Sequence, residues 1–380
     1  MAQAFGNLPS GVSKTPEKFT LKVPDQSVDE FQQLLKLSKI GPETWYNKQE
    51  DGQFGVSRKW LIDAKEAWLK FDWRKQEARI NSVPNFKAKV EDADLGTVDV
   101  HFAALFSNKK DATPVIFMHG WPGSFLEFFP MIDLLVSKYT PDTLPYHVIV
   151  PSLPGYGLSA GSIPLEKETQ QEAVARTLHQ LMLDLGFDSG YAAQGGDVGS
   201  FMARIMSGYK ECKAFHLNML MPTPEDAAGG TDGLTPQELQ QTGRMLKWRS
   251  TGMSIGEKYI EWVDSRYPLQ LETILELVSL YWYTDTFPRS IYPYRPLAKA
   301  MSSEGGGTTI PTSKETPLGY SCFPAEIGLM PKAWAEKSYP NLTQYRTHDK
   351  GGHFAALEQP TLLLQDVEDF LASVKAASKL

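Results

Sequence analysis

The sequence predicts an α/β fold in which a mostly parallel, doubly wound sheet is covered by helices on both faces. Short apolar runs recur between turn residues, and amphipathic segments separate these runs along the chain. Such runs are typical of strands buried on both faces, and strands that alternate with helices form parallel sheets. The first predicted strands are residues 115–118, 147–150, 191–194 and 215–220.

Amphipathic helices are predicted where apolar residues recur at intervals of three and four. One such helix covers residues 60–69, and another spans residues 174–185 and ends at Gly186. A third has its apolar face over residues 271–278. The alternation of strands and helices then resumes, with strands near Gly319 and at residues 342–346 and a closing helix at residues 362–374.

The chain length predicts more than one structural unit, because a single hydrophobic core stops growing at roughly 250–300 residues and this chain has 380 residues. We expect an N-terminal extension (residues 1–100) that packs on the core, and a core whose first part is residues 101–220. A mainly helical cap (residues 221–310) interrupts the core, which continues in residues 311–380. Insertions of this kind form lids over active sites.

Composition narrows the function classes. The net charge of −7 comes without a basic block, so neither a nucleic acid nor an anionic membrane surface is an expected partner. Cys212 and Cys322 cannot form a disulfide framework and lack metal-ligand spacing. Residues 1–9 do not resemble a signal peptide, and no apolar run is long enough for a membrane span. We expect a soluble, cytoplasmic protein that acts on a small neutral molecule without a metal or cofactor.

The most informative motif is Gly-Gly-Asp-Val-Gly-Ser at residues 195–200, between an apolar run and a helix-like segment. Small residues on both sides of a central residue allow a strand to turn sharply into a helix and expose the central side chain as a nucleophile. Here that side chain is Asp197, a carboxylate that could form an ester with substrate. The alternative is a glycine-rich turn in which Asp197 only caps the helix.

A second segment, residues 157–161, also fits the Gly-x-Ser-x-Gly pattern around Ser159. Its context differs, because it follows a proline-rich loop and leads to Ile163-Pro164 rather than to a helix start. We therefore do not expect Ser159 to be the nucleophile.

Two further segments supply the partners that a nucleophile needs. Residues 119–124, His-Gly-Trp-Pro-Gly-Ser, follow a predicted strand, where backbone N–H groups could form an oxyanion hole. The alternative is a tight turn with His119 as a structural hydrogen-bonding residue. Residues 350–356 contain His353 after the last predicted strand, the place where this fold positions its catalytic histidine.

The histidine requires an orienting carboxylate. Glu326 and Asp349 are the candidates, and Glu326 is preferred because it follows the penultimate predicted strand, whereas Asp349 lies too close to His353 in sequence. His348 competes with His353 but is expected to end the strand before it.

These segments occur in an order that resembles the microsomal-type epoxide hydrolases in their soluble fungal form, which have the α/β-hydrolase fold. The resemblance covers nearly the whole chain and includes residues 71–74 and 85–86, the two motifs above, residues 323–326 and residues 351–356. The resemblance implies that Asp197 is the nucleophile, His353 the base and Glu326 the acid that orients the base. It also implies that the N–H groups of Trp121 and Val198 form the oxyanion hole. A cap tyrosine that protonates the epoxide would be Tyr294, with Tyr292 as the alternative.

One part of the cap departs from the family pattern. Family members carry a first cap tyrosine between segments that match residues 243–246 and 255–258, but here only residues 247–254 join these segments, without a tyrosine. Tyr259 is close by but belongs to the following segment. We therefore expect a shortened cap, in which Tyr294 would activate the substrate alone or with help from Tyr292 or Tyr259.

The resemblance implies hydrolysis of epoxides to vicinal diols through an ester on Asp197, and it implies a homodimer. The alternatives are a haloalkane dehalogenase, which shares the aspartate and the histidine, and a catalytically impaired form that lacks part of the cap.

Overall fold

One nine-stranded sheet organises the molecule. In the computed structural model, residues 2–50, 54–163, 166, 168–223, 225–251, 269–296 and 310–377 are described. The strand order is β1-β2-β3-β5-β4-β6-β7-β8-β9. The strands are β1 (Glu17–Phe19), β2 (Asn85–Asp92), β3 (Gly96–Leu105), β4 (Thr113–Met118), β5 (Tyr146–Pro151), β6 (Tyr191–Gly195), β7 (Cys212–Leu217), β8 (Leu318–Cys322) and β9 (Leu342–Thr347).

Strands β4 to β9 pair with one another in parallel, as predicted, whereas β1 pairs with β2, β2 with β3 and β3 with β5 antiparallel. The N-terminal segment therefore extends the sheet itself, and residue 100 lies inside β3. Strand β7 ends three residues before the predicted end, because its register with β6 stops where Leu217 faces Gly195 and β6 turns into a helix.

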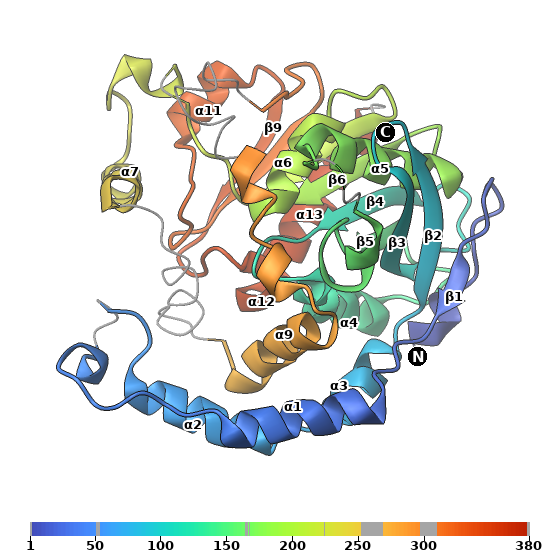
Figure 1. The fold of residues 1–380 in the computed structure, drawn as a ribbon. Helices are drawn as coiled ribbons and strands as arrows, with labels where there is room; N and C mark the ends of the chain where they lie inside the picture. The colour runs from blue at the N-terminus through green and yellow to red at the C-terminus, as the bar shows by residue number, and fades with distance from the viewer. Residues whose placement is uncertain are drawn as a thin grey trace.

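Helices cover both faces of the sheet (Figure 1). Those of the core are α4 (Phe129–Lys138), α5 (Gln171–Asp184), α6 (Asp197–Met206), α11 (Lys332–Ser338), α12 (Ala355–Glu358) and α13 (Pro360–Ala376). Along β4, Ile116 and Met118 pack in the cluster with α5 and α6, whereas Val115 and Phe117 pack with α4 and α13. This alternation places one hydrophobic cluster on each face of the sheet.

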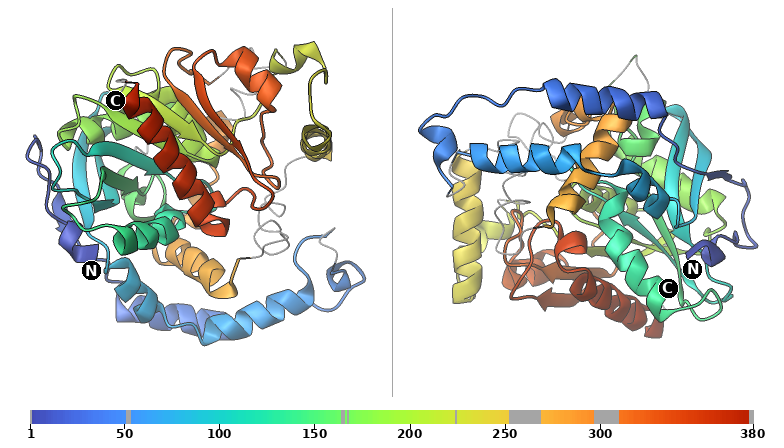
Figure 2. Two further views of the ribbon diagram at one scale, coloured as in Figure 1. Left: turned by 180° about the vertical axis from the view of Figure 1, so that it is seen from behind. Right: turned by 90° about the horizontal axis from the view of Figure 1, so that it is seen from below.

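The N-terminal helices pack against a helix of the predicted cap (Figure 2). They are α1 (Asp25–Leu37), α2 (Arg58–Leu69) and α3 (Trp73–Ile80), and the cap contributes α7 (Pro236–Thr251) and α9 (Leu271–Tyr283). Phe31 of α1 contacts the rings of Trp68 on α2 and Trp282 on α9, and the Trp68 indole donates a hydrogen bond to Ser279 on α9 at 2.8 Å. No helix among the described residues is long and apolar enough to cross a membrane.

Candidate active site

Asp197 lies at the sharp turn where β6 ends and α6 begins. Its backbone has φ of 46°, a left-handed conformation that is uncommon for a residue other than glycine. The turn passes very close to β4, since a Cβ atom on Gly199 would lie 1.9 Å from the carbonyl oxygen of Met118. A larger residue at position 199 would clash with β4, which explains the small residue there. The turn holds the Asp197 side chain at the carboxyl edge of the sheet.

One carboxylate oxygen of Asp197 accepts two hydrogen bonds. The backbone N–H of Trp121 donates to Oδ1 at 2.8 Å, and the hydroxyl of Tyr294 donates to the same oxygen at 2.7 Å. Trp121 comes from the loop after β4, and Tyr294 follows the short 3-10 helix η6 (Phe287–Arg289). Val198 is the second residue of α6, and the first N–H groups of a helix have no acceptor within the helix.

His353 lies between two carboxylates, and its side chain is fully buried. Its Nε2 is 3.2 Å from Oδ2 of Asp197, and its Nδ1 is 2.8 Å from Oε1 of Glu326. Burial alone would lower the pKa of the imidazole, but the charge of Glu326 and the hydrogen bonds to both carboxylates raise it well above its ordinary value. The two carboxylates therefore favour the protonated form of the imidazole.

Glu326 is fixed by the loop that carries it. Its Oε1 also accepts hydrogen bonds from the backbone N–H groups of Ile327 at 2.6 Å and Gly328 at 3.1 Å. Asp349, the alternative acid, has an exposed side chain. Of the two candidate acids, Glu326 is the one that contacts His353.

The competing histidine and serine have other contacts. His348 follows β9, and its Nε2 is 2.7 Å from Oδ2 of Asp366 on α13. Ser159 is buried, and its hydroxyl oxygen accepts a hydrogen bond from the backbone N–H of His101 at 2.9 Å. Both side chains thus join elements of the fold.

His119 is held by the backbone on both sides of its ring. Its Nδ1 lies 2.8 Å from the carbonyl oxygen of Gly120, and its Nε2 accepts a hydrogen bond from the N–H of Leu153 at 3.0 Å. Burial lowers the pKa of His119 to about 4. The ring is therefore neutral, and it fixes the loop that presents the N–H of Trp121.

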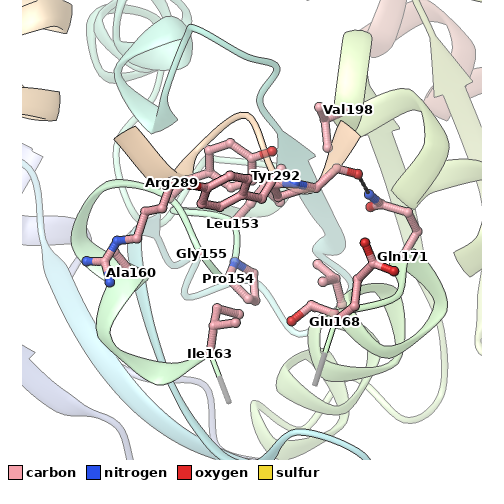
Figure 3. Close-up of a pocket in the computed structure, with 14 residues that line it drawn as sticks. Leu153, Pro154, Gly155, Ala160, Ile163, Glu168, Gln171, Val198, Arg289 and Tyr292 are labelled. Atoms are coloured by element: carbon pink, nitrogen blue, oxygen red, sulfur yellow. Dashed lines mark hydrogen bonds between the residues drawn. The ribbon is translucent and has the colours of Figure 1, made fainter. Parts of the chain in front are cut away.

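A cavity of about 290 Å³ lies beside Val198 (Figure 3). Its wall is mainly apolar and includes Leu153, Ile163 and Val174, and Gln171 donates a hydrogen bond to the carbonyl oxygen of Pro293 at 2.9 Å at its edge. Tyr292, the alternative to Tyr294, also borders this cavity, but 63% of it is exposed. Residues 247–251 of the shortened cap segment form the end of α7, whereas residues 252–254 and Tyr259 lie outside the described residues.

Comparison with known proteins identifies the family and the fold of the chain. The family model described as epoxide hydrolase N terminus matches residues 16–128, and the alpha/beta hydrolase fold model matches residues 113–259. The solved epoxide hydrolase of Aspergillus niger is 40% identical, with a TM-score of 0.85 over 97% of this chain and 99% of that chain. The chain belongs to the epoxide hydrolase family. Epoxide hydrolase 1 of Sus scrofa is 29% identical over 93% of this chain and 88% of its own length.

The fold of the family extends to more distant members. Juvenile hormone epoxide hydrolase of Bombyx mori is 22% identical, with a TM-score of 0.78 over 97% of this chain and 96% of that chain. No group of three or more His, Cys, Asp or Glu side chains within the described parts of the chain could hold a metal ion.

Two buried polar side chains near Asp197 were not singled out from the sequence. Glu127 lies in the 3-10 helix η3 (Phe125–Phe128), and Asn218 directly follows β7. Both line a small cavity together with Asp197 and His353. A signal for Glu127 was available, because it is the one charged residue in the apolar run at residues 125–129. Asn218 gave no comparable signal.

Proposed function

We propose that this family member hydrolyses epoxides to vicinal diols through a covalent ester on Asp197. The observation that carries the proposal is the environment of one carboxylate: Oδ1 faces hydrogen-bond donors, and Oδ2 faces the imidazole of His353. The proposed acid, Tyr294, and the proposed base, His353, thus each lie within hydrogen-bonding distance of the proposed nucleophile.

In the first half-reaction, Oδ2 of Asp197 attacks an epoxide carbon from the side opposite the ring oxygen. The carbon–oxygen bond breaks, and the released oxygen takes the proton of the Tyr294 hydroxyl. Burial, and then the charge of Asp197, raise the pKa of Tyr294 well above its ordinary value, so the phenol carries its proton before the reaction. A hydroxyalkyl ester on Asp197 and a Tyr294 phenolate result.

Ester formation changes the state of His353. The ester carries no charge, so one of the two carboxylates that raise the pKa of the imidazole is lost. The pKa therefore falls, and His353 releases its proton to the solvent and becomes a base; it takes a proton back from the solvent once turnover has restored the Asp197 carboxylate. Glu326 still holds Nδ1 and leaves Nε2 facing the ester.

In the second half-reaction, His353 takes a proton from water as the water oxygen bonds to Cγ of Asp197. The charge that develops on Oδ1 is met by the N–H groups of Trp121 and Val198. The Cγ–Oδ2 bond then breaks, and the diol leaves with Oδ2 after taking the proton from His353. The carboxyl proton that remains on Asp197 returns to the Tyr294 phenolate.

Mass spectrometry of the intact protein tests this scheme. The His353→Gln variant with excess styrene oxide should accumulate one adduct on Asp197, because general-base catalysis contributes typically 10²–10⁴-fold. A single turnover of wild-type enzyme in H₂¹⁸O should leave the label on Asp197, and the diol of that turnover should be unlabelled. An adduct elsewhere, or diol formation by Asp197→Ala, would contradict the proposal.

A further inference from the structure

A small cavity lies behind Asp197 and His353, in addition to the large cavity beside Val198. Its volume, as the space open to the centre of a water molecule, is about 10 Å³. A space of this size holds about one water molecule, provided that polar groups surround it. Its polar lining comes from four regions of the chain and consists of Glu127, Asp197, Asn218 and His353.

Asn218 reaches this cavity because a glycine leaves room for it. A Cβ atom on Gly196 would lie 2.5 Å from Nδ2 of Asn218. Oδ1 of Asn218 accepts a hydrogen bond from the buried Gln194 side chain at 2.9 Å, which orients the amide and turns Nδ2 toward the nucleophile turn. The N–H donor of a 5% exposed amide is thereby fixed beside Asp197.

Glu127 packs against Gly123, a glycine of the motif at residues 119–124, in the same way. A Cβ atom on Gly123 would lie 1.3 Å from Oε1 of Glu127, so only glycine permits the carboxylate to occupy this position. Glu127 is 6% exposed, although a carboxylate is costly to bury without polar neighbours. The two glycine-containing motifs thus admit one acceptor and one donor to the same cavity.

We propose that this cavity holds the water that attacks the ester, and that Glu127 and Asn218 are further catalytic residues that bind it. The inference rests on the proposed function and specifies its second half-reaction. Nδ2 of Asn218 donates to the water oxygen, the carboxylate of Glu127 accepts one water proton in a hydrogen bond, and His353 takes the other proton. A lone pair of the water oxygen then points at Cγ of Asp197.

This assignment separates the two half-reactions. Ester formation needs no water, so the loss of either polar group should leave that step near the wild-type rate. Ester hydrolysis needs an oriented water, and misplacement of a reactant by about 1 Å can cost roughly 100-fold in rate. The expected signature is therefore a slow decay of the adduct with unchanged adduct formation.

Rapid-quench mass spectrometry with styrene oxide measures both rates on the same protein. In Glu127→Gln and in Asn218→Ala, we expect adduct decay to slow by roughly 10- to 100-fold while adduct formation changes less than about threefold. The two variants are made separately, and thermal unfolding establishes that each is folded before its rates are compared.

The matched control is Glu276→Gln, which removes a buried carboxylate on α9 that pairs with Arg79 and does not line the cavity. Its adduct should decay at the wild-type rate. Wild-type decay in both cavity variants would overturn the water site, and so would an equal slowing of both steps. Failure of the wild-type protein to form any adduct would instead refute the proposed function.

Discussion

The Tyr294 hydroxyl donates a 2.7 Å hydrogen bond to Oδ1 of Asp197. The proposed acid and the proposed nucleophile are therefore in direct contact. An epoxide must take the place of Asp197 as the acceptor of this hydrogen bond when it enters. The same contact offers a direct path for the carboxyl proton of Asp197 to return to the tyrosine after turnover.

Replacing Tyr294 by phenylalanine should slow ester formation by about 10²–10⁴-fold, because the epoxide oxygen loses its proton donor. Adduct formation on Asp197 after rapid mixing with styrene oxide measures this rate. Tyr292→Phe is the matched control, since Tyr292 is 63% exposed and lies two residues away. Similar rates of ester formation in the two variants would exclude Tyr294 as the acid.

Replacing Glu326 by glutamine should shift the pH dependence of adduct decay. The charge of Glu326 raises the pKa of His353, so its loss lowers that pKa, and the neutral base persists to lower pH. We expect the acid limb of the decay profile to move to lower pH and the plateau rate to fall. An acid limb that stays in place would show that Glu326 does not act on His353 through its charge.

The buried carboxyl group of Glu358 on α12 should make the free energy of unfolding depend on pH. Burial raises the pKa of its carboxyl group from 4.5 to about 7 in the folded protein. The folded state therefore binds more protons than the unfolded state between these values, and the free energy of unfolding falls as pH rises through this window. Glu358→Gln removes this loss.

The stability difference between Glu358→Gln and the wild-type protein should therefore change with pH. Urea unfolding at pH 5 and pH 8 should show that Glu358→Gln gains stability relative to wild type at the higher pH, by about 1–3 kcal/mol. Glutamine can still accept the hydrogen bond from the N–H of Phe354. An equal difference at both pH values would contradict the raised pKa.

Replacing Ser159 by alanine should lower the stability of the protein without changing the rate of ester formation. The buried hydroxyl oxygen accepts a hydrogen bond from the N–H of His101, so its loss should cost about 1–3 kcal/mol in the free energy of unfolding. Adduct formation on Asp197 should be unchanged. If a folded Ser159→Ala protein formed no adduct, this prediction would be contradicted and Ser159 would again be a candidate nucleophile.

The sequence located those elements of the site that depend on local chain geometry. Asp197, the loop of Trp121 and the loop of His353 all follow predicted strands, and parallel strands end at one edge of a sheet. Their proximity was thus predictable from periodicity and small residues alone. The position of Tyr294 came only from resemblance, because nothing local relates η6 to a turn almost a hundred residues earlier.

Long-range relationships account for what periodicity did not predict. The antiparallel strands β2 and β3 were not foreseen, since their pairing with the core depends on contacts between distant segments. Asn218 was assigned to the interior of a strand, although β7 ends at Leu217. Its place beside the nucleophile turn follows from the neighbouring strand, and one strand's pattern does not contain that information.

The antiparallel addition of β1, β2 and β3 to the sheet has a practical consequence for protein production. A fragment that began after residue 100 would lack β1, β2 and about half of β3, and would leave His101, Phe102 and Ala103 of β3 without their partners on β2. Unpaired strand edges of this kind recruit other chains and promote aggregation. Expressed fragments and fusion proteins should therefore retain the chain from β1 onward.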